Sequence, residues 1–233
     1  KWKDTLVVDG SGNGDYRTIV LAPSNIQEAV DLTQDAFDLA DRYRNPVVLL
    51  ADGMIGQMME PVVFPDRKLQ ITDKPWSCSG HKNKREHNII NSLYLRPDEL
   101  EQSVRTRFER YEEIKENCTD AELYLCDDAE IILTAFGATS RIVKSAVDIA
   151  RSSGIKAGLF RPKTLYPFPI KELNKACTTA KRVLCVEMSM GQMVDDIRLG
   201  LECRLPVDFF GRTGGNIPSV KEIVEQITSS GKE

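Results

Sequence analysis

The chain has 233 residues, of which 41% are hydrophobic and 28% charged, and its formal net charge is −4. This composition suffices for one large core or two smaller ones, while the acidic balance speaks against a nucleic-acid-binding surface. No apolar run reaches the roughly 18 residues of a membrane-spanning helix, and the start lacks the apolar core and cleavage site of a secretory signal. We therefore expect a cytoplasmic globular protein without nucleic-acid or membrane partners.

The cysteines and histidines show no metal-binding pattern. The six cysteines, at positions 78, 118, 126, 177, 185 and 203, are widely spaced and form no C-x-x-C pair. We expect reduced thiols rather than zinc or iron–sulfur ligands. His81 and His87 lie six residues apart without a matching pattern of carboxylates or thiols, so we expect exposed histidines.

The first segment contains glycines at 10, 12 and 14, a spacing that is similar to a dinucleotide-binding fingerprint. That fingerprint must open a helix. Gly14 instead precedes a strand-type run from Thr18 to Leu21, so we predict a glycine-rich connector.

A β-α-β unit follows. Ser24 is the expected N-cap of a helix that continues to Tyr43, Pro46 closes the helix, and residues 47–51 form the next strand. Parallel units of this kind are almost always right-handed. Two strands are too few for a doubly wound domain, so we expect residues 1–66 to be the end of a larger domain.

The loop from Asp52 to Glu60 follows the second strand, where ligands and partners gather in α/β sheets. Its three methionines suit an adaptable contact surface, and they equally suit a buried cluster that fills a gap between helix and sheet. Residues 61–97 show little periodicity and predict an extended connector. The next helix begins at Pro97 or Asp98 and carries one apolar stripe, which predicts that it lies on another surface. The stripe consists of Leu100, Val104, Phe108, Tyr111 and Ile114.

The clearest local pattern runs from Glu130 to Ser153. An apolar run at 131–136 predicts a buried strand, Gly137 permits a sharp turn, and Thr139 is the expected N-cap of a helix that Gly154 ends. The turn can be an anion site at a helix N-terminus or simply a tightly packed corner of the sheet.

Strands and helices then alternate with short loops up to the end of the chain, which predicts a parallel, three-layer α/β domain. The expected strands are 157–160, 183–186 and 207–210, and the expected helices are 170–178, 194–201 and one that begins at Pro218 or Ser219. Residues 161–169, RPKTLYPFP, are expected to be a turn.

Several segments, from about Gly14 to Ile227, resemble one protein family in order. Two of them, AFGATSRIVKSAVDIARSSGIKAGLFRPKTLYPFP and VLCVEMSMGQMVDDIRLGL, resemble the transketolase-like C-terminal domain of the α subunit of 2-oxoacid:ferredoxin oxidoreductases. The segment GDYRTIVLAPSNIQEAVDLTQDAFDLADRYRNPVVLLADGMIGQMMEPV resembles the end of that subunit's pyrimidine-binding domain. NIINSLYLRPDELE resembles the connector of the branched-chain, or 2-oxoisovalerate, type.

The resemblance implies three parts. Residues 1–66 are a partial thiamine pyrimidine-binding-type domain, 67–119 a connector with an amphipathic helix, and 120–233 a transketolase C-terminal-like domain. Such enzymes oxidatively decarboxylate a 2-oxoacid, transfer the acyl group to coenzyme A and reduce ferredoxin. The implied partners are β, γ and ferredoxin-like subunits, and ferredoxin itself.

Little of the family's catalytic equipment is visible in this sequence. The glutamate that activates the aminopyrimidine belongs to a part of the pyrimidine domain that precedes these segments, and the chain has no G-D-G diphosphate motif. The resemblance therefore implies no catalytic residue and no cofactor or metal in this chain, with thiamine diphosphate, magnesium and iron–sulfur clusters in the full assembly. We expect the isolated chain to be inactive. Asp52, Gly53 and Gln57 are the residues expected near the cofactor or a subunit interface. An alternative function is a free-standing regulatory module that binds a nucleotide or acyl group at the Gly137–Thr139 and Gly191–Gln192 turns.

Overall fold

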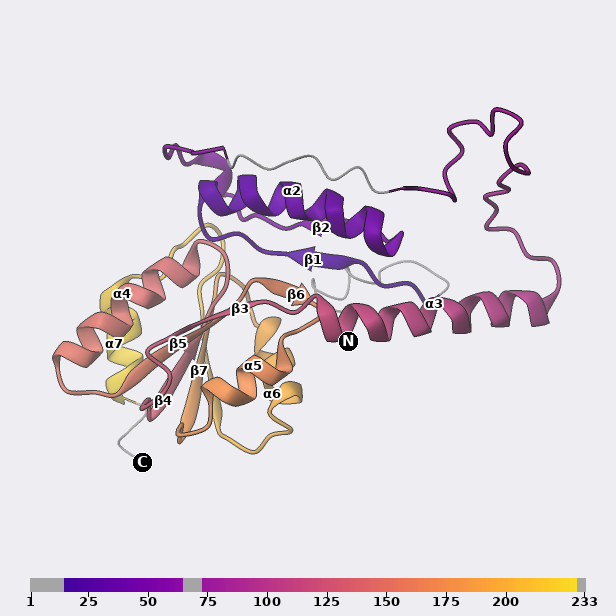
Figure 1. The fold of residues 1–233 in the computed structure, drawn as a ribbon. Coiled ribbons are helices and arrows are strands. Elements are labelled where there is room, and N and C mark those ends of the chain that lie inside the picture. Colours follow the sequence, from indigo (N-terminus) through magenta and orange to yellow (C-terminus); the bar gives the residue numbers. More distant parts are fainter. Residues whose placement is uncertain (1–14, 65–72, 230–233) are drawn as a thin grey trace.

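Two β-sheets organise the protein (Figure 1). The computed structural model describes residues 15–64 and 73–229. The predicted glycine connector at residues 10–14 lies outside these ranges. None of the helices in the described part of the chain combines the length and apolar character that crossing a bilayer requires.

The first sheet has three strands in the order β2-β1-β6. Its elements are β1 (Ile19–Leu21), α2 (Ile26–Tyr43), β2 (Val47–Leu49) and β6 (Thr164–Tyr166). β1 and β2 are parallel and joined by α2, which confirms the predicted β-α-β unit. The N-cap of α2 is Asn25 instead of Ser24, because the Asn25 side chain accepts a hydrogen bond from the backbone N–H of Glu28 at 2.8 Å. The second strand ends at Leu49, two residues before the predicted end.

β6 was not predicted. It lies within RPKTLYPFP, which we expected to be a turn, and it pairs antiparallel with β1, with Val20 opposite Tyr166. Its three residues stand between Pro162 and Pro167, so the segment carries loop signals at both ends. A strand from the C-terminal half of the chain thus completes the N-terminal sheet.

The second sheet has five strands in the order β3-β5-β4-β7-β8. These are β3 (Ala121–Tyr124), β4 (Ile131–Thr134), β5 (Ala157–Pro162), β7 (Arg182–Glu187) and β8 (Val207–Gly211). The strands β5, β4, β7 and β8 are parallel, as predicted, and β3 is an unpredicted edge strand that runs antiparallel to β5.

Helices cover both faces of this sheet, which gives the predicted three-layer α/β architecture (Figure 1). The helices are α4 (Thr139–Ser152), α5 (Ile170–Ala176), α6 (Met193–Gly200) and α7 (Val220–Ser229). α4 and α7 lie together on one face, and α5 and α6 lie on the other. β4 has both faces covered, which explains its continuous apolar run.

α3 (Pro97–Asn117) begins at Pro97, as expected, and links the two sheets. The inner end of its apolar stripe packs on the first sheet, where Tyr111 and Ile114 are buried. The Tyr111 hydroxyl also accepts a hydrogen bond from the backbone N–H of Arg17 at 3.1 Å. The outer end extends past both sheets (Figure 1), and the predicted contact of the stripe with another surface holds only for the inner part. Residues 61–64 and 73–96 contain no helix or strand.

Candidate functional site

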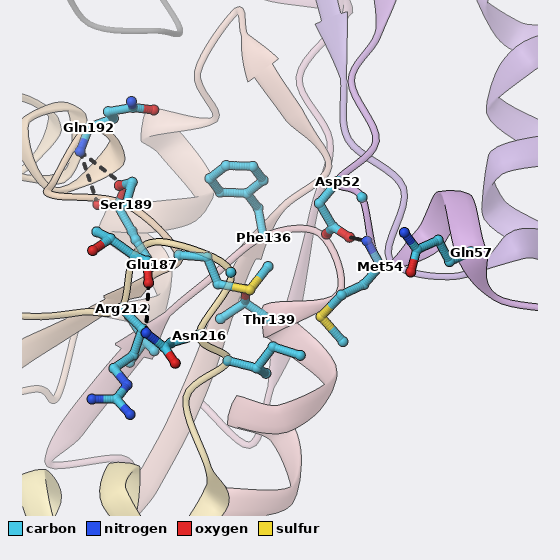
Figure 2. A pocket seen from close by; sticks show the side chains of 16 residues that line it. Asp52, Met54, Gln57, Phe136, Thr139, Glu187, Ser189, Gln192, Arg212 and Asn216 are labelled. Atoms are coloured by element: carbon cyan, nitrogen blue, oxygen red, sulfur yellow. Dashed lines mark hydrogen bonds between the residues drawn. The ribbon is translucent and has the colours of Figure 1, made fainter.

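A cavity of about 530 Å³ lies at the carboxyl ends of β2, β4, β7 and β8 (Figure 2). In the second sheet, β5 lies on one side of β4 and β7 on the other, so the cavity opens at the point where the strand order reverses. Ligands of open α/β sheets bind at such switch points. Its wall is partly apolar, with Met54, Phe136 and Ile217, and partly polar, with Thr139, Gln192 and Asn216.

The three residues predicted to lie near a cofactor or interface, Asp52, Gly53 and Gln57, all line this cavity. They belong to the loop after β2, which continues into a short 3₁₀ helix, η1 (Ile55–Gln57). The first sheet therefore contributes one wall of the cavity, and the second sheet contributes the opposite wall (Figure 2).

The Asp52 carboxylate holds this loop to the second sheet. One oxygen, Oδ1, accepts hydrogen bonds from the backbone N–H groups of Met54 and Ile55, both at 3.0 Å. The other, Oδ2, accepts one from Ala138 at 2.7 Å, at the start of α4. Gly137 makes this approach possible, because it has a φ of 61° and a Cβ there would lie 2.6 Å from Oδ2. The predicted role of Gly137 as a sharp turn fits this conformation.

The Asp52 contact corrects one expectation for the same turn. Thr139 is not the N-cap of α4: the cap position is Ala138, which has no side chain able to cap, and Thr139 is the first helical residue. The Asp52 carboxylate occupies the position at the helix N-terminus where an exogenous anion would bind. Thr139 is only 3% exposed and lines the cavity, and its hydroxyl makes no hydrogen bond to any residue in the described ranges.

Glu187 at the end of β7 has the same role for α6, and sequence reasoning did not single it out. Its side chain is 3% exposed, and its carboxylate accepts hydrogen bonds from the backbone N–H groups of Gln192 (3.0 Å), Met193 (3.2 Å) and Val194 (2.9 Å). The Ser189 hydroxyl adds a further bond at 2.9 Å. The available signal was a lone acidic residue that ends an apolar strand shortly before a glycine and a helix, as Asp52 does after β2.

A third remote carboxylate, that of Glu60, acts on α2. Its Oε2 accepts a hydrogen bond from the backbone N–H of Ile26 at 3.0 Å, and Arg141 of α4 donates to Oε1 at 2.8 Å. The hydrogen bond from Ile26, assisted by Arg141, lowers the pKa of Glu60. Carboxylates of the chain itself thus bind backbone N–H groups at the starts of α2, α4 and α6, where free N–H groups would otherwise attract an anion.

A buried guanidinium also joins the two sheets. Arg161 of β5 is 3% exposed and donates two hydrogen bonds to Glu28 of α2, at 2.9 and 2.7 Å, and one to Glu122 of β3, at 2.8 Å. Burial by itself raises the pKa of Glu28, but the bonds from Arg161 and Ser24 outweigh it and lower the pKa. The network fixes α2, and with it the first sheet, relative to the second sheet.

Over residues 15–64 and 73–229, no group of three or more His, Cys, Asp or Glu side chains is arranged to hold a metal ion. The rings of His81 and His87 lie 4.0 Å apart in the connector; His87 is exposed, as expected, whereas His81 is half-buried. Cys118, Cys126, Cys177 and Cys185 are buried, and all six cysteines are free thiols. Burial raises the pKa of Cys185, which favours its thiol form.

Two family models match the chain. Residues 2–122 match the model for "Pyruvate flavodoxin/ferredoxin oxidoreductase, thiamine diphosphate-binding". Residues 129–223 match "Pyruvate:ferredoxin oxidoreductase core domain II".

Among individual proteins, the ketoisovalerate oxidoreductase subunit VorB of Methanothermobacter marburgensis is 45% identical over 222 residues, covering 95% of this chain and 62% of the relative. The 2-oxoglutarate synthase subunit KorA of the same organism is 30% identical over 250 residues, covering 96% of this chain and 67% of the relative. The chain therefore spans about two thirds of the length of these relatives.

The fold also has a counterpart among solved structures. It superposes on 2-oxoglutarate:ferredoxin oxidoreductase from Magnetococcus marinus with a TM-score of 0.76 and 18% identity, over 98% of this chain and 45% of that one. This likeness shows the common fold, while the sequence matches show the family. The chain belongs to the pyruvate flavodoxin/ferredoxin oxidoreductase family, which confirms the resemblance seen in its sequence.

Proposed function

We propose that the chain is a portion of the α subunit of a 2-oxoacid:ferredoxin oxidoreductase that acts on a branched-chain 2-oxoacid. In this reaction the 2-oxoacid loses CO₂, the acyl group passes to coenzyme A, and two electrons pass to ferredoxin. The observation that carries the substrate class is the difference in identity over nearly the same span. The ketoisovalerate-type subunit is 45% identical, whereas the 2-oxoglutarate-type subunit is 30% identical.

Within such an assembly, we propose that the chain supplies scaffold, a subunit interface and one wall of the active-site region. Asp52 is used internally, because three backbone N–H groups bind its carboxylate. Gly53 and Gln57 lie exposed on the same loop and are the groups a neighbouring subunit or cofactor can contact. The Thr139 hydroxyl across the cavity is a further free hydrogen-bonding group.

The residues of the cavity do not fit the diphosphate and metal end of thiamine diphosphate. Arg212 is the one Lys or Arg among the described lining residues, and it forms an ion pair with Glu222 at 3.3 Å. The helix ends that face the cavity bind the chain's own carboxylates, those of Asp52 and Glu187, instead of an exogenous anion. We therefore propose that thiamine diphosphate, its magnesium ion and the iron–sulfur clusters are held mainly by β, γ and ferredoxin-like partner subunits, and we assign this chain no catalytic step.

The three-part division into residues 1–66, 67–119 and 120–233 remains part of the proposal. The first family model ends at residue 122 and the second begins at residue 129, which supports a division near the start of the second sheet. A cytoplasmic location is also proposed, in keeping with the six free thiols.

The regulatory-module alternative has less support. It needs a nucleotide phosphate or an acyl carrier at the Gly137–Thr139 and Gly191–Gln192 turns, and both turns bind a carboxylate of the chain. A thermal-shift comparison of the isolated chain with nucleotides and coenzyme A would favour the alternative if either raised the melting temperature.

The proposed function is tested on the native complex. The chain is tagged in its own host and purified without oxygen, and coenzyme A-dependent viologen reduction is measured with 2-oxoisovalerate, 2-oxoglutarate and pyruvate. We expect partner subunits in the preparation and a kcat/KM for 2-oxoisovalerate about tenfold or more above that for 2-oxoglutarate. If none of the three 2-oxoacids supports activity, the proposed function is wrong. If 2-oxoglutarate is preferred, the proposed substrate class is wrong.

A further inference from the structure

An exposed apolar segment projects from the molecule between the two sheets. We call residues 73–108, the described connector and the outer part of α3, the arm. Figure 1 shows α3 and the connector extending away from both sheets. The arm carries seven large apolar side chains that are more than a third exposed, including Ile89 at 86%, Leu93 at 67% and Leu95 at 86%. Apolar surface gathered on one segment marks an interaction site.

The outer apolar side chains of α3 lie on the same helical row as side chains that pack in the core. Its stripe is one row of side chains at helical spacing, and its inner members, Tyr111 (2% exposed) and Ile114 (0%), are core residues. Leu100 (44% exposed) and Phe108 (38% exposed), farther out on the same row, are only partly covered, and Phe108 contacts Tyr111 edge-on with the ring centroids 5.4 Å apart. The stripe is thus longer than the surface that residues 15–64 and 73–229 offer it, and its outer part is available to a second surface.

The charge of the arm indicates what kind of surface would cover its exposed apolar side chains. The basic excess lies in the connector part of the arm, where residues 73–96 contain five Lys or Arg against two Asp or Glu; the helical part, residues 97–108, contains two against three, and the net charge of the whole chain is −4. Lys82 and Lys84 are exposed and form no ion pair with any residue that the structure describes. A basic segment with apolar side chains is complementary to an apolar surface bordered by carboxylates.

We infer that the arm binds a partner subunit of the same assembly, at an apolar surface bordered by Asp and Glu side chains. The inference rests on the proposed function, because it needs partner subunits, and it adds the segment of this chain that holds them. No residue of the arm lines the cavity, so its role does not depend on what the cavity binds.

The apolar part is tested by Leu93→Asp combined with Leu95→Asp in the tagged native complex. The matched controls are Phe37→Asp on α2 (72% exposed) and Leu199→Asp on α6 (74% exposed), each tested alone and in combination, and the combination places the same two negative charges on similarly exposed apolar positions outside the arm. We expect the arm variant to lower the amount of co-purified partner by about tenfold or more and the controls to leave it unchanged. Melting of each isolated variant should stay within about 2 °C of the unsubstituted chain, which excludes misfolding as the cause.

The charged part is tested by Lys82→Glu combined with Lys84→Glu, with Lys221→Glu on α7, whose side chain is 86% exposed, as the control. We expect the association rate of chain and partner to fall several-fold for the arm variant alone, and its dependence on salt to weaken.

The outcomes separate the inference from the proposed function. If the unsubstituted chain brings down no partner subunit, the proposed function itself fails. If it brings down partners and the arm variants do so equally well, the arm is not the interface and the inference is wrong. If the arm substitutions instead convert a dimer of the isolated chain to a monomer while partner binding stays intact, the arm binds a second copy and the inference is again wrong.

Discussion

At the scale of single residues, the main feature is the use of remote carboxylates as helix caps. Asp52, Glu60 and Glu187 each accept backbone hydrogen bonds from the cap position or the first residues of a helix, and none of them is the residue directly before that helix. Two of these contacts, Asp52 to Ala138 and Glu60 to Ile26, join segments that are distant in the sequence. Local N-cap preferences therefore predict Thr139, the nearest hydroxyl residue, and do not indicate the distant carboxylate that binds the start of this helix.

The Asp52 contact makes Gly137 harder to replace than other glycines with positive φ. Gly137→Ala adds backbone strain and a Cβ 2.6 Å from the Asp52 carboxylate, whereas Gly154→Ala, at a φ of 84°, adds strain alone because nothing lies within 4 Å. We expect Gly137→Ala to lower the free energy of unfolding by about 3 kcal/mol and Gly154→Ala by about 1 kcal/mol. Urea unfolding of both variants measures the difference, and equal losses would mean that the carboxylate moves aside at no cost.

Glu28 should give the protein a defined acid sensitivity. Its pKa is lowered from the ordinary value of 4.5 in the folded chain, since the hydrogen bonds from Arg161 and Ser24 outweigh burial. A lowered folded-state pKa stabilises the fold above the unfolded pKa, and this stabilisation is lost as the pH falls through the folded value. We expect the stability gap between the unsubstituted chain and Glu28→Gln to be constant from about pH 7 to about pH 5 and to shrink below about pH 4. Urea unfolding across this range checks it, with Glu101→Gln on the exposed face of α3 as the control.

At the scale of elements, the sequence predicts those whose stabilising contacts are local or strongly patterned. Buried parallel strands such as β4 show continuous apolar runs, and α2 and α4 show helical periodicity, so each was found to within a few residues. β3 and β6 were missed for different reasons. β3 lies at an edge with all four residues half-buried, and β6 exists only because it pairs with β1, far away in the sequence. Neither leaves a periodic signal long enough to detect.

The apolar stripe of α3 should divide into two parts with different effects on stability. Ile114 is fully buried against the first sheet, whereas Leu100 is 44% exposed. We expect Ile114→Ala to cost about 3 kcal/mol because it leaves a cavity, and Leu100→Ala to cost less than about 0.5 kcal/mol in the isolated chain. Chemical denaturation of the two variants gives both values. A large loss for Leu100→Ala would show that the outer part of α3 already packs on this chain.

At the scale of the whole molecule, three connections fix the first sheet to the second: the pairing of β6 with β1, the Asp52 contact with α4, and the Arg161 network with Glu28. The cavity lies between the parts that these contacts hold together. Its position could be predicted, because a loop after a parallel strand indicated Asp52, Gly53 and Gln57. The opposite wall of the cavity could not be predicted, because the sequence does not show which strand ends of the second sheet face the loop after β2.

The arrangement of charges in the cavity leads to a prediction for the isolated chain. Thiamine diphosphate carries its negative charge on the diphosphate, which needs a metal ion, free helix N-termini or unpaired cations. In the described residues, the helix ends at the cavity bind Asp52 and Glu187, Arg212 is paired with Glu222, and no acidic group is arranged for a metal. We therefore expect isothermal titration of the chain with thiamine diphosphate and magnesium to show no dissociation constant below about 100 μM. The purified complex with its partner subunits is the positive control. A dissociation constant of about 1 μM for the chain alone, or about −8 kcal/mol, would mean that the carboxylate caps give way to the diphosphate and that the partner subunits are not needed to complete the site.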